Sequence, residues 1–410
     1  MSLIPAVRAM SRMLPRGLKD GIPPGLKAAY YARMREHRRQ GAASVDALGK
    51  VVESLRTQSL ADYLVTQFDP REDIEAQPTH FTIEINSSCN LNCVMCRSKE
   101  SQRPNTLMDL SLFEDSLLKL KSVGARAINF HTINEVTANV RFGKYLEIMR
   151  KHRMTLSRLS SNCQLLDRAM DTIIEYSDVI EVFRPSIDGA SKATYEFIRE
   201  GGTWETLNRN LMKFAERNNK LRQPIDVEVS NVVMKCNFHE IGYLPAAYEF
   251  AVPVHKHNFG FIGSMPTARG LEDFRDQNYF DRAEVHIAPC NMPWQYMVVL
   301  TDGRISGCCV EFDGDVVYGD VASFDGVFNS PAAQAIRSAH RRKDMEAMPP
   351  ACRYCYAVDP RFSQVIDTIV RLFYTEVRRH PAYLQAALDR VGPALKAGDL
   401  DTVMAVAEHL

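Results

Sequence analysis

Three cysteines in the segment CNLNCVMC have the spacing of a metal-binding loop. Cys89, Cys93 and Cys96 follow the strand-like run at residues 81–86. Three thiolates can bind three irons of a four-iron, four-sulfur cluster and leave the fourth iron open to a small molecule. Zinc is the alternative, because this spacing also suits a tetrahedral zinc site, but no histidine or further cysteine lies nearby to complete one. The spacing therefore favours a cluster with one open iron.

A second set of cysteines follows in the C-terminal half of the chain: Cys290, Cys308, Cys352 and Cys355, with Cys309 as an alternative to Cys308. Residues 294–300 and 304–310 are strand-like, and the sequence Thr-Asp-Gly at 301–303 is a strong signal for a hairpin turn between them. Four thiolates complete either a structural zinc site or a cluster whose irons all have protein ligands. The residues alone leave these two possibilities open.

The first cysteine motif resembles that of the radical S-adenosylmethionine (AdoMet) superfamily, in which the open iron binds AdoMet. Met95 departs from the family pattern, which commonly has an aromatic residue at this place. Glu135 takes the place of the glutamate in the family's Gly-Gly-Glu motif, and the resemblance implies that it binds the AdoMet amino group. Ile133 and Asn134 replace the two glycines, so the side chain of Asn134 is a further candidate contact for AdoMet.

The run at residues 179–188 resembles the fourth strand of the family's barrel and ends in a Ser-x-Asp-Gly sequence. The resemblance implies that Ser186 contacts the ribose or carboxylate of AdoMet, with Asp188 beside it in the site. It also implies that Arg199, in the following helix, pairs with the AdoMet carboxylate through its guanidinium group. Without the cysteine motif, Arg199 would be interpreted as an ordinary surface charge of a helix.

The second cysteine set resembles the Twitch domain, a shorter relative of the SPASM domain that holds one auxiliary cluster. A full SPASM domain has further cysteines, and none follows Cys355. The two resemblances together imply two four-iron, four-sulfur clusters and AdoMet as cofactors. They also imply an electron donor, such as flavodoxin or ferredoxin, as a partner.

The composition agrees with an enzyme that has one main domain and smaller additions. The 410 residues include 50 basic and 50 acidic side chains, so the overall charge gives no indication of nucleic acid as a partner. Ten cysteines and no signal peptide indicate a cytoplasmic protein whose thiols bind metals. No apolar run is long enough to predict a transmembrane segment.

Alternating strand-like and helical segments predict an α/β fold with parallel strands and crossover helices. The strand-like runs are 81–86, 127–130, 156–161, 179–187, 226–234 and 253–259. The resemblance implies a partial, TIM-like barrel of six strand–helix units, with its chemistry at the carboxyl ends of the strands. We predict four regions: a helical N-terminal extension (1–75), the partial barrel (76–286), the auxiliary-cluster domain (287–358) and a helical C-terminal tail (359–410).

The resemblance implies that a 5′-deoxyadenosyl radical removes a hydrogen atom from a substrate that the protein positions and shields from water. Our first hypothesis is the oxidation or epimerisation of a small hydroxylated molecule, such as a sugar or cyclitol. The second is a maturase that modifies a ribosomal peptide. The third is a zinc-binding protein without enzymatic activity.

Two further cysteines bear on the choice between oxidation and epimerisation. Cys163 and Cys236 end the third and fifth strand-like runs, so either thiol could return a hydrogen atom to a substrate radical, although buried cysteines also serve as small apolar side chains. Cys163 stands where many relatives have glycine, which slightly favours it. Histidines at the ends of strands are further candidates for substrate binding or proton transfer: His131, His239, His255 and His257.

Overall fold

The structure is a computed structural model that describes residues 78–353, with gaps at 97, 99–100, 235, 241–243, 253–255, 262–289, 291, 310–312 and 343. The helical extensions predicted at the two ends lie outside the described residues. The chain divides into one unit at residues 1–59 and another at 60–410, and every described residue belongs to the second unit.

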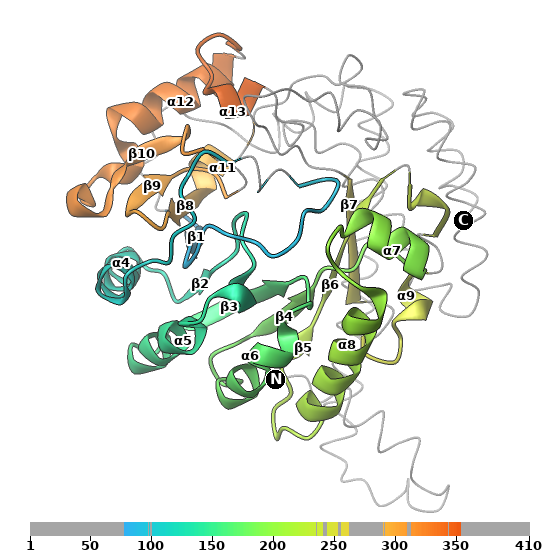
Figure 1. The fold of residues 1–410 in the computed structure, drawn as a ribbon. Helices are drawn as coiled ribbons and strands as arrows, with labels where there is room; N and C mark the ends of the chain where they lie inside the picture. The colour runs from blue at the N-terminus through green and yellow to red at the C-terminus, as the bar shows by residue number, and fades with distance from the viewer. Residues whose placement is uncertain are drawn as a thin grey trace, which may run out of the picture. The chain divides into compact units, whose positions relative to one another are not determined.

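Five parallel strands form the part of the main sheet that follows the sequence order of the predicted barrel (Figure 1). They are β1 (His80–Ile83), β2 (Ala127–Asn129), β3 (Thr155–Ser161), β4 (Val182–Pro185) and β5 (Asp226–Val227). A parallel pair, β6 (Val229–Val233) and β7 (His257–Phe261), continues beyond β5, and a bridge between Ser186 and Ser230 links it to the end of β4. The predicted α/β fold with parallel strands is confirmed.

Helices connect successive strands, as the alternation of the sequence predicts. They are α4 (Leu110–Ser122), α5 (Phe142–Lys151), α6 (Leu166–Glu175), α7 (Lys192–Ile198), α8 (Trp204–Asn218) and the short α9 (Leu244–Ala247). Polar side chains begin several of them: Asp109 accepts hydrogen bonds from the backbone of Ser111 and Leu112, and Thr203 accepts one from Thr206. Single 3-10 turns occupy Val136–Ala138 (η3) and Phe238–Glu240 (η4).

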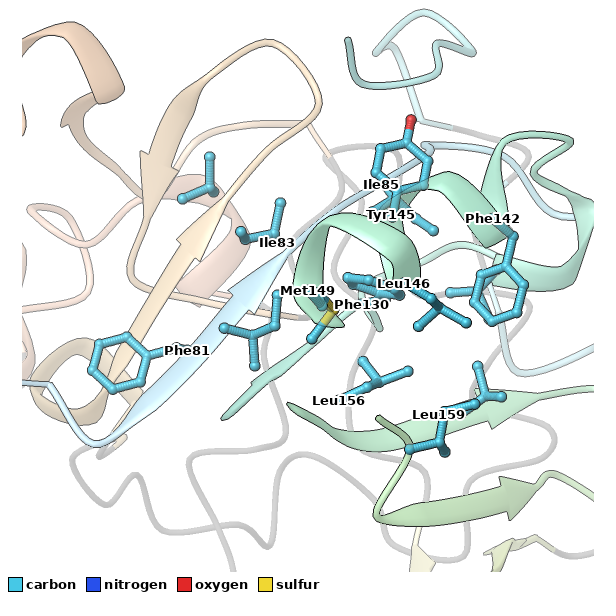
Figure 2. Close-up of a cluster of buried hydrophobic side chains, with 14 of the residues drawn as sticks. Phe81, Ile83, Ile85, Phe130, Phe142, Tyr145, Leu146, Met149, Leu156 and Leu159 are labelled. Atoms are coloured by element: carbon cyan, nitrogen blue, oxygen red, sulfur yellow. The ribbon is translucent and has the colours of Figure 1, made fainter. Parts of the chain in front are cut away.

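The hydrophobic core lies between the sheet and these helices. Figure 2 shows side chains of α5, including Phe142, Tyr145 and Met149, packed together with Phe130 after β2 and with Leu156 and Leu159 of β3. The Phe130 ring lies edge-on to that of Phe142, with 6.5 Å between their centroids. We call the other side of the sheet, whose side chains alternate with these, the inner face.

A bulge in β3 changes which of its side chains reach the inner face. Ile128 pairs with Leu156 and Asn129 pairs with Arg158, so Ser157 is an extra residue between two paired positions. Leu156 and Leu159 are both fully buried in the core, although they are three positions apart, and Arg158 between them is partly exposed. Because an extra residue shifts the alternation by one, the bulge turns Arg158 to the inner face.

The C-terminal cysteine-rich segment extends the same sheet. β8 (Tyr296–Val299) pairs in parallel with β1, and β8 and β9 (Arg304–Ser306) form the predicted hairpin. Gly303 in its turn has a φ of 88°, which only glycine adopts without strain. β10 (Val317–Asp320) pairs antiparallel with β9 at the edge. The remaining elements are α11 (Met292–Gln295), η7 (Val321–Ser323), η8 (Val327–Asn329), α12 (Pro331–Arg342) and α13 (Pro350–Arg353). In the part of the chain that the structure describes, no helix is long and apolar enough to cross a membrane.

Candidate active site

The loop after β1 brings the first three cysteines into one small apolar cluster. Cys93 is buried and Cys89 and Cys96 are partly buried against Leu91, Met95 and Ile198. Backbone hydrogen bonds hold this loop against the end of α7, from Asn92 to Glu200 and from Val94 to Ile198, each 2.9 Å long. Among the residues with described positions, no three His, Cys, Asp or Glu side chains converge as ligands of a single metal ion. A four-iron cluster takes one thiolate per iron, so its cysteines surround the cluster rather than one ion.

Two nitrogen donors approach the sulfur atoms of this loop. Arg199 Nη1 lies 3.6 Å from Cys93 Sγ, and Asn162 Nδ2 lies 3.8 Å from Cys89 Sγ. Hydrogen bonds to the ligating sulfur atoms are one means by which a protein sets the potential of a cluster. Sequence reasoning missed Asn162, although its place directly before Cys163 at the end of a predicted strand was a usable signal.

Glu135 is fully enclosed beside the cysteine loop, where burial raises its pKa. Its Oε1 accepts hydrogen bonds from the backbone and hydroxyl of Thr137 and from the hydroxyl of Ser161. Its Oε2 accepts a bond of 2.7 Å from the backbone of Asn162. Within the described part of the chain Oε2 has only this one donor, so it retains capacity for another.

The side chain of Asn134 forms hydrogen bonds that stabilise the loop after β2. Its Nδ2 donates to Asn86 and to the carbonyl of Phe130, and its Oδ1 accepts from the backbone of Thr132. These side-chain hydrogen bonds stabilise the loop, which contains no glycine. The contact of Asn134 with AdoMet stays a prediction, and the hydrogen bonds here show a structural role for its side chain.

The end of β4 places Asp188 and Arg199 together. Asp188 is fully buried, has a φ of 70° and accepts a hydrogen bond of 2.7 Å from the backbone of Val232. Its Oδ2 forms an ion pair with Arg199. Gly189 follows because a Cβ at this position would lie 2.6 Å from the backbone nitrogen of Tyr195. The Ser-x-Asp-Gly sequence thus fixes a sharp turn, and Ser186 before it stays partly exposed on the inner face.

These residues fit a bound AdoMet. Arg199 Nε is buried and has no hydrogen-bond partner among the described residues, although the guanidinium lies beside Cys93. Such a buried donor calls for an acceptor, and the AdoMet carboxylate is one. The roles of Glu135, Ser186 and Arg199 toward AdoMet remain predictions.

The structure separates the two candidate hydrogen donors. Cys163 is fully buried in the main core, its Sγ lies 3.6 Å from the carbonyl of Ser161, and burial raises its pKa. Its φ of 64° explains the glycine of many relatives, since glycine adopts such angles at little cost. Cys236 is instead partly exposed and belongs to the apolar cluster of the first three cysteines. Cys236 therefore packs beside the cysteine loop, whereas the Cys163 side chain is enclosed in the core next to Ser161.

The second cysteine set gathers around two tyrosines. Cys290, Cys308 and Cys352 all act electrostatically on Tyr318, whose hydroxyl donates to the carbonyl of Pro293 at 2.8 Å. Burial raises the pKa of Tyr296 to about 12, and the charge of Cys309 adds to this effect. Cys355 lies outside the described residues.

The inner face between the two cysteine sets is polar. Arg158 and Arg184 lie there with Glu228, and Arg158 Nη2 is 4.0 Å from Glu228 Oε2. His131, after β2, has an exposed side chain. Its pKa is nevertheless lowered, first by desolvation and then by the charges of Arg184, Arg158 and Arg199. The face therefore carries cationic groups beside a neutral imidazole.

Two of the other three histidine candidates, His239 and His257, lie away from this face. His239 is exposed, with its Nε2 3.7 Å from Glu240. His257 is buried next to Asn231, and burial lowers its pKa to about 3. His255 lies outside the described residues.

A buried ion pair that sequence reasoning missed holds the site together. Glu84, directly after β1, binds both terminal nitrogens of Arg103 at 2.6 and 2.7 Å. The same carboxylate accepts a hydrogen bond from the hydroxyl of Thr132 and one from the backbone of Thr301. It thereby joins the cysteine loop, the loop after β2 and the β8–β9 hairpin.

Comparison with protein families agrees with this geometry. The family model for the radical SAM superfamily matches residues 83–226, and the SPASM model, an iron-sulfur cluster-binding domain, matches residues 290–356. A search of curated proteins found no match.

Three solved structures are similar to this chain at low sequence identity. SuiB from Streptococcus suis, bound to precursor peptide SuiA, is 14% identical over 70% of this chain and 72% of its own, with a TM-score of 0.50. The protein anSMEcpe, with bound AdoMet and Cp18Cys peptide, is 15% identical over 78% of this chain and 100% of its own, with a TM-score of 0.50. BtrN, in complex with AdoMet and 2-DOIA, is 15% identical over 69% of this chain and 94% of its own, with a TM-score of 0.44.

Proposed function

Because the chain belongs to the radical SAM superfamily, we propose that it removes a hydrogen atom from a small hydroxylated molecule, of sugar or cyclitol type, and so oxidises or epimerises it. Its matched domains imply a four-iron, four-sulfur cluster with AdoMet and an auxiliary cluster as cofactors. When bound together, the first cluster and AdoMet supply the reactivity that breaks an unactivated C–H bond. The polar inner face carries the proposal of a small polar substrate, because hydroxyl groups need hydrogen-bond partners once they leave water.

The chain's own residues would hold these components. Cys89, Cys93 and Cys96 would ligate the first cluster, and the second cysteine set would ligate the auxiliary cluster of a Twitch-type domain. Glu135 and Arg199, each fixed by hydrogen bonds or an ion pair within the chain, would bind the amino and carboxylate groups of AdoMet.

The position of Cys236 supports the epimerase version of this proposal. Its thiol lies in the same apolar cluster as the first three cysteines, and burial raises its pKa to about 11. It therefore stays protonated at neutral pH and retains the S–H hydrogen that it would donate to a substrate carbon. Oxidation would result if no thiol reaches that carbon.

Deuterium transfer tests the proposed function. Anaerobically reconstituted enzyme would be incubated with AdoMet, a reductant and deuterated sugars and cyclitols, and 5′-deoxyadenosine would be analysed by mass spectrometry. We expect deuterium in the 5′-deoxyadenosine formed with the correct substrate class. Deuterium transfer from a peptide, and from none of the polyols, would refute it.

A peptide substrate is the second candidate function. SuiB and anSMEcpe, which share the fold at a TM-score of 0.50, are seen with a bound peptide. A short precursor-peptide gene next to this gene would favour this maturase function, whereas sugar or aminocyclitol genes would favour the first. A mass change in the peptide, dependent on AdoMet, would establish it.

A further inference from the structure

We infer that Asn162 raises the reduction potential of the first cluster by donating a hydrogen bond to the ligating sulfur of Cys89. The inference rests on the proposed function in one respect, since that function requires a cluster at Cys89, Cys93 and Cys96. Asn162 is then a positioning residue, because it acts on the cluster through one of its cysteines.

The hydrogen bonds of Asn162 fix the orientation of its side-chain amide. The backbone nitrogen of Gln164 lies 3.0 Å from Asn162 Oδ1. Because a backbone N–H group can only donate, the atom that faces it must be the amide oxygen. The amide nitrogen therefore points the other way, 2.9 Å from Asn90 Oδ1 and 3.8 Å from Cys89 Sγ. This nitrogen carries two hydrogens, so it can donate to both atoms.

The surroundings of Asn162 hold this amide in place. Its backbone nitrogen donates to Glu135 Oε2 at 2.7 Å. Its side chain closes a turn on Gln164, of the kind that asparagine often forms directly after a strand. Asn162 is only 5% exposed, so little water competes for its donor. In such a buried position the hydrogen bond to Cys89 is electrostatically stronger than it would be in water.

A donor at a ligating sulfur favours the reduced form of a cluster. Reduction adds one electron, and an N–H group stabilises the part of this charge that resides on the sulfur, so it raises the potential. The backbone N–H of Leu91 also donates to Cys89, so Asn162 supplies part of the stabilisation. Unlike Arg199, which pairs with the buried Asp188, Asn162 can be replaced without leaving a buried charge unpaired.

Redox titration followed by electron paramagnetic resonance tests the inference in the absence of substrate. The anaerobically reconstituted protein would be reduced stepwise, and the midpoint potential of each cluster would be determined. The signal that changes on addition of AdoMet belongs to the first cluster. A variant with alanine at the first three cysteines gives the signal of the auxiliary cluster alone.

Two substitutions of Asn162 remove the donor and keep the turn. Asn162→Ser retains an oxygen for the Gln164 N–H but is too short to reach Cys89. We expect it to lower the equilibrium constant for reduction of the first cluster about tenfold, which is a shift of about 59 mV. Asn162→Asp is nearly isosteric and places a carboxylate beside the sulfur, so the potential should fall further.

Asn92→Ser is the matched control. Asn92 lies in the same loop as the cysteines, but its amide donates to Glu200 Oε2 at 2.8 Å on the surface. This variant should leave the midpoint potential of the first cluster unchanged.

Three results would overturn the inference. They are an unchanged potential in both Asn162 variants, an equal shift in Asn92→Ser, and loss of the first cluster's iron in both Asn162 variants, which would show a structural role only. The deuterium-transfer assay tests the proposed function separately. A lowered potential in the Asn162 variants, together with no deuterium transfer from any polyol, would support the inference and refute the proposed substrate class.

Discussion

Replacing Glu84 with alanine should destabilise the protein strongly. The carboxylate is fully buried and the Arg103 side chain is 5% exposed, so the substitution leaves a guanidinium enclosed without its carboxylate. The loss of one partner of a buried ion pair costs about 3–5 kcal/mol. Because the carboxylate also accepts hydrogen bonds from Thr132 and Thr301, we expect the upper part of this range.

Urea unfolding of the anaerobically reconstituted protein, followed by far-ultraviolet circular dichroism, measures this loss. Glu147→Ala is the matched control, because Glu147 pairs with Lys144 at the surface, where both side chains are more than half exposed. Such pairs contribute about 0–1 kcal/mol. The double variant Glu84→Met with Arg103→Leu should recover part of the stability, because it removes both buried charges together. A loss below about 1 kcal/mol in Glu84→Ala would refute this account of the ion pair.

Three further predictions concern the cysteines and the effect of pH. Anaerobic reconstitution should give about eight irons per chain. The triple variant in which alanine replaces Cys89, Cys93 and Cys96 should retain about four irons and form no 5′-deoxyadenosine. If the enzyme is an epimerase, Cys236→Ala should stop epimer formation and retain hydrogen abstraction, whereas Cys163→Ala should mainly lower stability; the products in deuterated solvent decide between them. Because the pKa of His257 falls from 6.5 to about 3 on folding, the unfolded chain binds its proton first, so the free energy of unfolding should fall as the pH drops through this interval. In urea unfolding at several pH values, the free energy of unfolding of His257→Asn should depend less on pH than that of the unaltered protein. An unchanged pH dependence would contradict this role of His257.

The sequence was sufficient to predict those structural features that depend on residues close together in the chain. The cysteine spacing, the alternation of strands and helices and the Thr-Asp-Gly turn each depend on neighbouring residues, and the parallel sheet and the β8–β9 hairpin follow the predicted order. The resemblance, which implies glycine at the position of Cys163 in many relatives, was also a usable signal. Its meaning was conformational, since the φ of 64° favours glycine for reasons unrelated to hydrogen donation.

Features that depend on tertiary pairing could not be read from the sequence. The segment TLSRLSS gives no indication of which residue is extra, because only the partner strand defines the bulge at Ser157. Glu84 and Arg103 are 19 residues apart across a loop, and nothing in their types predicts that they meet. The direct pairing of β8 with β1 joins strands that are more than 200 residues apart, so it also needed the structure.

The pairing of β8 with β1 has a consequence for electron transfer. The first cysteine set follows β1 and the second set flanks the β8–β9 hairpin, so adjacent strands of one sheet carry both sets. Strands in a sheet are held about 4.8 Å apart by their backbone hydrogen bonds. Both cysteine sets are therefore anchored to neighbouring strands of one sheet. If each set holds its cluster, electron transfer between the two would not require a hinge motion between domains.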